Sequence, residues 1–438
     1  MSATLSGIIG KIRQHRGIIA NFSYLTVIQM ISLLVTLATY PYLIRVLGKD
    51  QFGLVVYAQA IVTYLVILVS YGFQISATRE VSVHRNEPEQ VNQIFSSVLI
   101  LKGMLFLFSF GILFLVFAIF PAVREHRILF CLSMFTCFYE FIFPSWFFQG
   151  IEKMGYITII TIITKSTFFI LIFVFIRTSE DYLLVPLFSG IGSVLAGIIS
   201  LWIAFSREKI RFSFQPVHRL WYHLRESSAL FASNIANQVY VNSNKVIVGI
   251  FLGMSEVALY DLAEKVVLAM KLPQYLLNQA IFPKVSKELN AGFTKKVLYI
   301  SIVGQIGFYA VIALLAPVIV LILGGKGMMD SISLLRLLAL TVPINAISSL
   351  LGIQFLVAHG FKRVYTRVVV SSVVVYTAAC CLLYILNWVT LPGVIGATIV
   401  AEIFVLLAMI GAVVRRSGGD KERLGGEEVR RLGSERRL

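Results

Sequence analysis

Charged residues are scarce in this sequence. Asp, Glu, Lys and Arg supply 14% of its 438 residues, whereas 58% are hydrophobic. Soluble globular domains carry roughly 25% charged residues, so most soluble enzymes, nucleic-acid-binding proteins and disordered proteins are excluded. The formal net charge is nevertheless +16, which in a membrane protein reflects Lys and Arg held on the cytoplasmic side.

Cysteine and histidine are also rare. All four cysteines lie within apolar stretches, which argues against a secreted disulfide framework. The six histidines are scattered without an H-E-x-x-H zinc pattern, and Gly324-Gly325-Lys326 does not fit a P-loop because Val320 stands where that motif needs glycine. We therefore expect no metal site, no catalytic residue, no cofactor and no ATP-driven step.

Long apolar runs occupy most of the chain. A membrane helix needs about 20 mostly apolar residues, and Gly, Pro and charge clusters delimit twelve such runs. They lie near residues 20–44, 52–76, 93–120, 127–149, 156–176, 182–205, 228–252, 256–281, 297–323, 331–358, 364–387 and 392–414. The first follows a basic N-terminus, as in a signal peptide, but it is too long and lacks a cleavage site. The sequence predicts an all-α integral membrane protein with twelve transmembrane helices.

The distribution of Lys and Arg predicts the orientation. Alternate segments between the helices, starting with the N-terminus, hold 26 of these residues, whereas the intervening segments hold 6. Because positive residues stay inside, both termini are expected in the cytoplasm.

The longest hydrophilic connector divides the chain into six helices plus six. We predict an N-terminal lobe over residues 1–206, a cytoplasmic connector over 207–226, a C-terminal lobe over 227–414 and a flexible cytoplasmic tail over 415–438. Weak echoes support a repeat. Leu47-Gly48, Leu54 and Ala58 recur 205 positions later as Leu252-Gly253, Leu259 and Ala263, and Gly150 and Lys153 recur 210 positions later as Gly360 and Arg363. Two halves of six helices would enclose a site at their interface.

Ten ionisable residues fall inside the predicted spans. They are Lys102, Lys165, Lys245, Lys265, Lys271, Arg336, Glu140, Asp261, Glu264 and Glu402. Each would cost about 2.5–3.5 kcal/mol at the bilayer centre, so most must pair, reach the interface or line water. The excess of cations favours an anionic ligand such as a phosphate, and the acids are candidates for proton or Na⁺ coupling.

Polar residues line one face of three predicted helices. On helix 256–281 the stripe within about 140° contains Asp261, Glu264, Lys265, Lys271, Tyr275, Asn278 and Gln279. On helix 228–252 it contains Asn234, Asn237, Gln238, Asn242 and Lys245, and on helix 20–44 it contains Asn21, Gln29, Ser32, Thr36 and Thr39. Three such faces predict a water-filled cavity.

A purely structural explanation of these charges stays open. Asp261 and Lys265 are four residues apart and could neutralise each other. Lys102 lies near a helix end and could extend to the interface. Glu140 and Glu402 could be lone carboxyl groups kept neutral by burial.

Four segments resemble a known family. They are PYLIRVLGKDQFGLVVYAQA (41–60), YGFQISATRE (71–80), WFFQGIEKMGYI (146–157) and FLGMSEVALYDLAEKV (251–266). These segments resemble the Wzx-type O-antigen flippases of the polysaccharide transport family, within the multidrug/oligosaccharidyl-lipid/polysaccharide (MOP) exporter superfamily. The resemblance covers residues 10–415.

The resemblance implies two six-helix lobes around a central cavity that opens alternately to each side. It implies transport of undecaprenyl-diphosphate-linked O-antigen, or a similar polysaccharide unit, from the inner to the outer leaflet of the bacterial inner membrane. A proton or Na⁺ gradient would drive it, and a polysaccharide polymerase and chain-length proteins would be partners. Peptidoglycan-precursor flippases of the superfamily usually have more than twelve spans, which argues against lipid II as substrate.

The stripes and motifs together suggest roles for individual residues. Proposed substrate contacts in the cavity are Lys245, Lys265, Lys271, Arg45, Asn242 and Asn278. Candidates for ion coupling are Asp261, Glu264, Glu140 and Glu402. We expect Arg79 and Glu80 to be gate residues, because they end a family motif on the cytoplasmic side; the alternative for them is a solvated charge pair. The alternative for Arg45 is an ordinary interface anchor.

Two rival functions are considered. A membrane glycan polymerase or transferase would need positioned acids, bases or a metal and a sizeable external loop, whereas each external loop here has about a dozen residues or fewer. A multidrug/cation antiporter of the same superfamily would need an acid-rich cavity, whereas cations prevail here.

Overall fold

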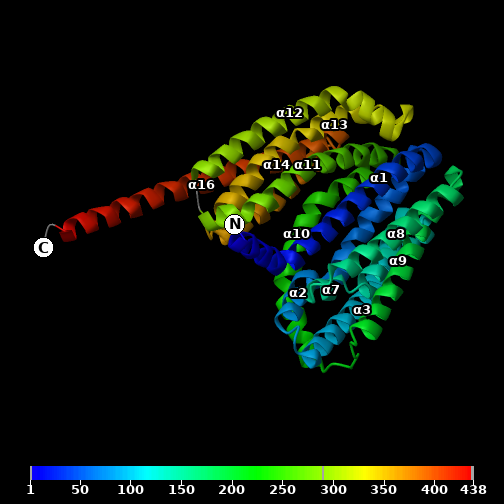
Figure 1. Ribbon diagram of the computed structural model, residues 1–438. Helices are drawn as coiled ribbons and strands as arrows, with labels where there is room; N and C mark the ends of the chain where they lie inside the picture. The colour runs from blue at the N-terminus through cyan, green and yellow to red at the C-terminus, as the bar shows by residue number, and fades with distance from the viewer. Residues whose placement is uncertain (1, 289–290, 436–438) are drawn as a thin grey trace. The chain divides into compact units, whose positions relative to one another are not determined.

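The computed structural model describes residues 2–288 and 291–435 (Figure 1). Helices make up 89% of the chain, and the described residues contain no strand. The predicted all-α fold is therefore confirmed. The chain divides into two compact units: unit 1 comprises Met1–Gln238 with Leu323–Gly325, and unit 2 comprises Val239–Ile322 with Lys326–Leu438.

Unit 1 is built from long and short helices joined by short turns. Its elements are α1 (Ser2–Ser70), α2 (Phe73–Val83), α3 (Pro88–Ile119), α4 (Pro121–Glu125), α5 (Arg127–Ser133), α6 (Phe135–Ile142), α7 (Ser145–Gly150), α8 (Met154–Phe175), η1 (Ser179–Leu183), α9 (Leu184–Trp202) and η2 (Ile203–Arg207). Proline opens α3 and α4, where its missing N–H would have no helical partner. The helices α8 and α9 pack side by side (Figure 1).

Unit 2 begins within a helix that starts in unit 1. Its elements are α10 (Val217–Phe251), α11 (Met254–Glu288), α12 (Ala291–Gly324), η3 (Lys326–Met328), α13 (Ser331–Ala339), α14 (Thr341–Ser349), η4 (Leu350–Val357), α15 (Lys362–Ile385) and α16 (Leu391–Glu435). The unit boundary at Gln238 falls inside α10, which starts at Val217, before the predicted span. The helix α16 continues into the segment predicted as a tail, whose flexibility stays a prediction.

Nine helical segments among the described residues are long and apolar enough to cross a membrane. One of them, Val27–Val83, overlaps two of the predicted spans, 20–44 and 52–76. Between these two spans, Gly48 interrupts α1 with a non-helical backbone (φ 73°, ψ 168°). The helices α10 and α11 occupy the positions of two further predicted spans but are not among these nine segments. The count of twelve therefore remains a prediction.

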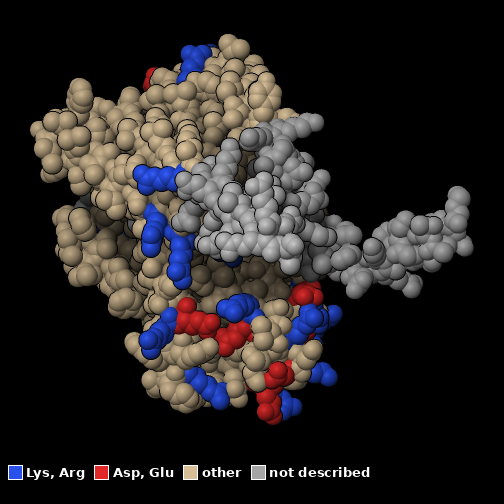
Figure 2. Space-filling model, turned by 90° about the vertical axis from the view of Figure 1, so that its left-hand side faces the viewer, with Lys and Arg blue, Asp and Glu red and all other residues tan. Residues whose placement is uncertain are grey.

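Large apolar side chains cover the outside of the long helices. On α3, Leu107, Phe108 and Phe114 are 70%, 60% and 63% exposed. A soluble protein rarely displays apolar surface of this extent, so these side chains fit contact with lipid. Figure 2 shows charged side chains gathered mainly at the lower end of the view, with wide uncharged surface above.

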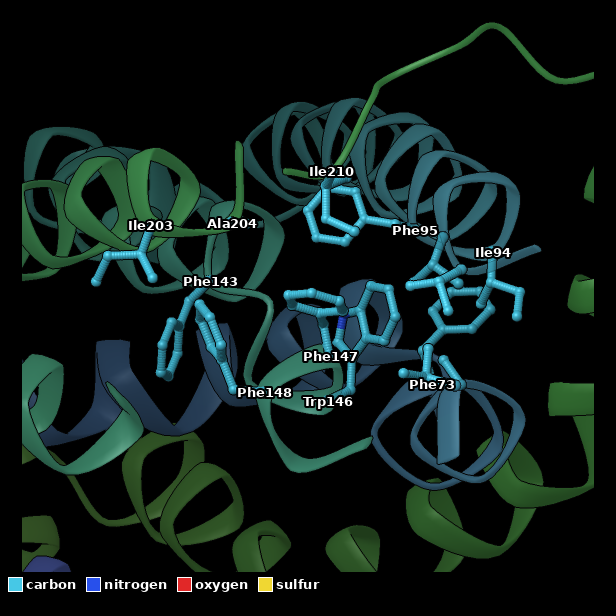
Figure 3. Packing of buried hydrophobic residues seen from close by; sticks show 14 of the residues in the cluster. Phe73, Ile94, Phe95, Phe143, Trp146, Phe147, Phe148, Ile203, Ala204 and Ile210 are labelled. Carbon is cyan, nitrogen blue, oxygen red and sulfur yellow. The ribbon is translucent and has the colours of Figure 1, made fainter. Parts of the chain in front are cut away.

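The core of unit 1 is an aromatic cluster (Figure 3). Phe73 from α2 and Phe95 from α3 meet Trp146, Phe147 and Phe148 from α7, and each is at most 1% exposed. The rings of Phe95 and Phe147 meet edge to face with centroids 5.2 Å apart, a favoured geometry for aromatic pairs. This cluster fixes α2, α3 and α7 together.

The backbone contains the same glycine turn at two positions that the internal sequence repeat had matched. Gly48 and Gly253, 205 positions apart, both have positive φ, at 73° and 104°. Each is followed by a buried leucine, Leu54 and Leu259, at 4% and 3% exposure. Glycine is favoured where the chain must leave a helix in a left-handed conformation. The two units therefore share a helix–glycine–helix element in equivalent positions.

Candidate functional site

A buried ionic triad lies in unit 2 where α10 faces α11. The Nζ atom of Lys245 lies 3.1 Å from Oδ1 of Asp261 and 2.5 Å from Oε2 of Glu264. The three residues are 8%, 1% and 7% exposed. One ammonium group therefore faces two carboxylates, and with all three ionised the triad carries a charge of minus one.

The sequence forms this triad through a tight helix reversal. The N–H groups of Leu252 and Gly253 both donate to the carbonyl of Val248, which ends α10. The positive φ of Gly253 then turns the chain into α11. Asp261 and Glu264 are three residues apart and so share one face of α11, the face that meets Lys245.

A second ion pair joins α11 to α16. The Nζ atom of Lys271 lies 3.3 Å from Oε1 of Glu402, and the Asn345 amide on α14 lies 3.5 Å from each Glu402 oxygen. Glu402 is 5% exposed, and the Lys271 side chain is 26% exposed. Glu402 is thus paired, so the alternative of a lone carboxyl group is wrong.

Asn244 forms a hub beside the triad. Its Nδ2 group donates to the hydroxyl oxygens of Tyr260 and Thr398 at 2.7 and 2.8 Å. Its Oδ1 atom accepts from the Tyr376 hydroxyl at 2.6 Å. These contacts tie α10 to α11, α15 and α16. Because Asn244 is 1% exposed, its side-chain amide bonds to these protein groups and not to solvent.

A cluster of uncharged polar groups continues along α11. The Asn278 amide donates to Ser349 at 3.1 Å and its Oδ1 accepts from Gln274 at 3.3 Å. Ser301 on α12 donates to Gln274 at 3.1 Å, and Gln354 donates to the Asn278 carbonyl at 2.8 Å. Gln354 belongs to η4, a π-helical segment, and such segments are frequent at functional sites.

Unit 1 also holds a buried ion pair, formed by two of the predicted intramembrane ionisable residues. The Lys102 ammonium group donates to Oε1 of Glu140 at 2.7 Å and to the Glu140 carbonyl at 2.8 Å. Lys102 is 1% exposed, so it does not extend to the interface. Glu140 is not a lone carboxyl group, since burial of a lysine ammonium requires an anionic partner.

The gate candidate Glu80 contacts α10 within unit 1. Its Oε2 lies 3.1 Å from Nδ1 of His223, and nearby the Ser76 and Ser227 hydroxyls are 2.7 Å apart. Arg79 is exposed. In the same part of α10, the carboxylate of Glu226 raises the pKa of the Tyr222 phenol. The roles of Arg79 and Glu80 as gate residues stay predictions.

Close packing accompanies the contact between α2 and α10. Gly72 has φ +81°, and a Cβ atom there would lie 2.8 Å from Cβ of Leu230. The rings of Tyr71 and Phe231 stack with centroids 4.5 Å apart. Glycine is therefore required at this position both by its backbone conformation and by the approach of α10.

The remaining predicted substrate contacts differ in their exposure. Lys265 and Arg45 are exposed, and Asn242 is half-buried. The side chains of Asn21, Asn237 and Gln279, which the polar stripes included, lie outside the described residues. The structure thus leaves Lys265 available at the surface of α11 while it engages Lys245 fully.

Several polar residues of these clusters were absent from the predicted site. They are His223, Asn244, Tyr260, Gln274, Ser301, Asn345, Ser349, Gln354, Tyr376 and Thr398. Most are single polar residues in apolar helices, which show no stripe. Asn244 directly precedes Lys245 and could have been found as part of a polar pair; the others become visible only from tertiary contacts.

Comparison with known proteins places this architecture among transporters. The sequence profile of a family described as "Polysaccharide biosynthesis protein" matches residues 18–289. A protein of Escherichia coli K12 named "Putative O-antigen transporter" is 28% identical over 390 residues, covering 86% of this chain and 92% of the relative. A Shigella dysenteriae protein of the same name is 27% identical over 383 residues, covering 85% and 94%.

Two solved structures have the same fold. An inward-facing multidrug resistance transporter of the MATE family and MOP superfamily has a TM-score of 0.69 and 14% identity, covering 92% of this chain and 99% of that chain. The lipid II flippase MurJ in an inward closed conformation has a TM-score of 0.67 and 16% identity, covering 90% and 87%. The predicted MOP fold is confirmed by these similarities, which concern the fold alone.

Proposed function

Because this chain belongs to the family described as Polysaccharide biosynthesis protein, we propose that it is a flippase for lipid-linked polysaccharide units. The chain is a multi-pass membrane transporter and not an enzyme. Its cargo would be an O-antigen or similar repeat unit on undecaprenyl diphosphate, moved by alternating access from the cytoplasmic to the periplasmic leaflet of the bacterial inner membrane, with both termini in the cytoplasm.

The observation that carries the proposal is the coincidence of the family match with the buried ionic groups. The matched residues 18–289 include all of the triad and both Lys265 and Lys271. Intramembrane ionisable residues mark substrate or ion pathways by default. The triad and both of these lysines therefore lie in the part of the chain that matches the family, while Glu402, the partner of Lys271, lies beyond it.

Within this proposal the triad serves ion coupling. Lys245 faces two carboxylates, Asp261 and Glu264, so these three groups together carry a charge of minus one when all are ionised. One of these carboxylates can bind a cation and release it again. A proton or Na⁺ gradient would then drive transport.

The best candidates for binding the diphosphate are the cationic side chains that remain accessible. Lys265 is exposed and Lys271 is partly exposed, whereas Lys245 already has two anionic partners. Arg45 is the third accessible candidate. A phosphate can attract an accessible ammonium or guanidinium group without separating a buried ion pair.

The test is complementation of a deletion strain with Lys265→Ala. We expect long-chain O-antigen to fall while the amount of protein in the membrane is unchanged, because the substitution removes a surface cation only. Lys362→Ala, which removes an exposed lysine at the start of α15, is the matched control. Lipopolysaccharide gels and immunoblots measure both. Unchanged ladders for Lys265→Ala would remove this residue from the site.

A cation antiporter of the same superfamily is the second candidate. The negative charge of the triad and the fold shared with a multidrug resistance transporter favour it. A deletion strain would then become sensitive to cationic drugs while its lipopolysaccharide stayed normal. The flippase proposal predicts the opposite pair of results, together with lipid-linked glycan accumulating in the cytoplasmic leaflet.

A further inference from the structure

Buried polar groups in unit 2 form a series of three stations. The first is the triad around Lys245, the second is the pair of Lys271 and Glu402, and the third is the uncharged cluster around Asn278. We call this series the polar seam. Its groups come from α10, α11, α12, α14, η4 and α16, which are otherwise mostly apolar.

An amide on α10 and a hydroxyl on α16 lie beside the first two stations. Asn244, adjacent to Lys245, donates to the Thr398 hydroxyl at 2.8 Å. Thr398 lies four residues before Glu402 on α16, so the two side chains follow each other on one helix face. Thr398 is 9% exposed, and the connection runs within the interior of the unit.

The second station connects to the third in the same way. The Asn345 amide lies 3.5 Å from each Glu402 oxygen, and Ser349 follows Asn345 by four residues on α14. Ser349 in turn accepts from Asn278 at 3.1 Å. The Oε1 atom of Gln354, whose side chain is fully buried beside Asn278, makes no hydrogen bond with any residue that the structure describes. A buried acceptor of this kind is where a water molecule binds.

The seam has the length of a membrane crossing. From Asp261 to Asn278, α11 rises about 26 Å at 1.5 Å per residue, and the hydrocarbon core of a bilayer is about 30 Å thick. The predicted orientation puts the Asp261 end toward the periplasm and the Asn278 end toward the cytoplasm.

We propose that the polar seam is a proton pathway through unit 2, with Glu264 and Glu402 as the groups that bind the proton in turn. The proposal rests on the ion coupling of the proposed flippase and names both its ion and its route. A proton fits better than Na⁺ because an ammonium group already lies within 3.3 Å of each carboxylate. A metal ion would have to displace a lysine, whereas a proton only needs a carboxylate oxygen.

The charges balance at each step. A proton from water forms an O–H bond with the Glu264 carboxylate, and Lys245 stays paired with Asp261, so the triad becomes neutral. The other groups acting on Glu264 are the exposed Lys265 and the Tyr260 phenol.

The proton then leaves Glu264 and binds Glu402 by way of hydroxyl groups and water. Lys271, the cation beside Glu402, keeps part of its hydration because its side chain is 26% exposed. When Glu402 releases the proton to water at the Asn278 cluster, every group has returned to its starting state.

The test is proton flux into liposomes that contain the full-length protein and a trapped pH-sensitive dye, with an imposed membrane potential. We expect Glu264→Gln and Glu402→Gln to reduce the flux to that of protein-free vesicles. Glu256→Gln, the same substitution in the first turn of α11, is the matched control and should keep the wild-type flux. Because a single variant could misfold, the double variant Lys271→Met/Glu402→Gln removes both charges together and should also lose the flux.

A second measurement separates this proposal from the flippase itself. Flipping of lipid-linked glycan is assayed in the same vesicles with and without a pH gradient. If wild-type protein flips glycan but conducts no protons, or if the Gln variants conduct normally, the pathway is overturned and the flippase stands. If protons pass through the seam but no glycan is flipped, the flippase is overturned and the pathway stands.

Discussion

The two units have opposite chemistry at corresponding positions of their shared helix–glycine–helix element. Tyr40 and Val56 are buried in unit 1, and the residues 205 positions later in unit 2 are Lys245 and Asp261, which are buried as an ion pair. The backbone element tolerates both pairs because each fills the same kind of interior position. The difference teaches that the same backbone element can bury uncharged residues in one unit and an ion pair in the other, while the buried ion pair of unit 1, Lys102 with Glu140, lies on other helices.

This contrast extends to the cores. The core of unit 1 is packed with aromatic rings such as Phe95 and Trp146, whose contacts depend on shape complementarity and not on a hydrogen-bonding partner. Unit 2 also buries apolar side chains, mainly on α11, α13 and α14, and its interior contains the polar seam in addition. Polar networks fix a unique arrangement only when every member is satisfied. We therefore expect unit 2 to be the more sensitive to single polar substitutions.

The largest effect is expected for Lys245→Ala. It leaves Asp261 and Glu264 buried without their cation, and removing one partner of a buried ion pair costs about 3–5 kcal/mol. The melting temperature of the purified protein in detergent should fall sharply. Replacing Tyr40 by Phe, at the equivalent position of unit 1, should change it little. A Lys245→Ala variant as stable as wild type would show that the triad is not the ionic core described above.

The polar stripe predicted on α11 does not describe the surroundings of its residues. The stripe joins buried residues, Asp261, Glu264 and Asn278, with exposed ones, Lys265 and Tyr275. It also suggested Lys265 as the partner of Asp261, whereas the structure pairs Asp261 with Lys245 across the Gly253 turn. Periodicity reports the direction of a side chain from its own helix, and pairing depends on how two helices pack.

Isolated polar residues were harder to recognise. Thr398 and Tyr376 each stand alone on an apolar helix and acquire a role only through Asn244. His223 lies in the predicted connector, and its contact with Glu80 joins segments more than 140 residues apart. No local pattern in the sequence records such distant contacts.

An intermediate effect is expected for Asn244→Leu. The substitution keeps the approximate volume but leaves the hydroxyls of Tyr260 and Tyr376 without their amide partner, and an unsatisfied buried polar group costs about 1–3 kcal/mol. Thermal unfolding in detergent should show a smaller loss than for Lys245→Ala. Tyr376→Phe removes the hydroxyl itself and so does not leave it without its amide partner, and it should cost less again. If Asn244→Leu were harmless, the polar seam would not be the element that organises unit 2.

The smallest effect is expected at the Ser76–Ser227 contact of unit 1. These two hydroxyls lie 2.7 Å apart between α2 and α10, and the Ser76 hydroxyl also contacts the carbonyl of Gly72 in its own helix turn. Interhelical hydrogen bonds in membrane proteins average about 0.6 kcal/mol in double-mutant cycles. The cycle of Ser76→Ala, Ser227→Ala and the double variant should give a coupling of this size in free energies of unfolding. The cycle of Asn244→Leu with Thr398→Val should give a larger one, because that contact belongs to a network. Equal coupling free energies in the two cycles would mean that interhelical hydrogen bonds stabilise both units to the same extent. The two units would then differ in the residues that they bury but not in how those residues stabilise them.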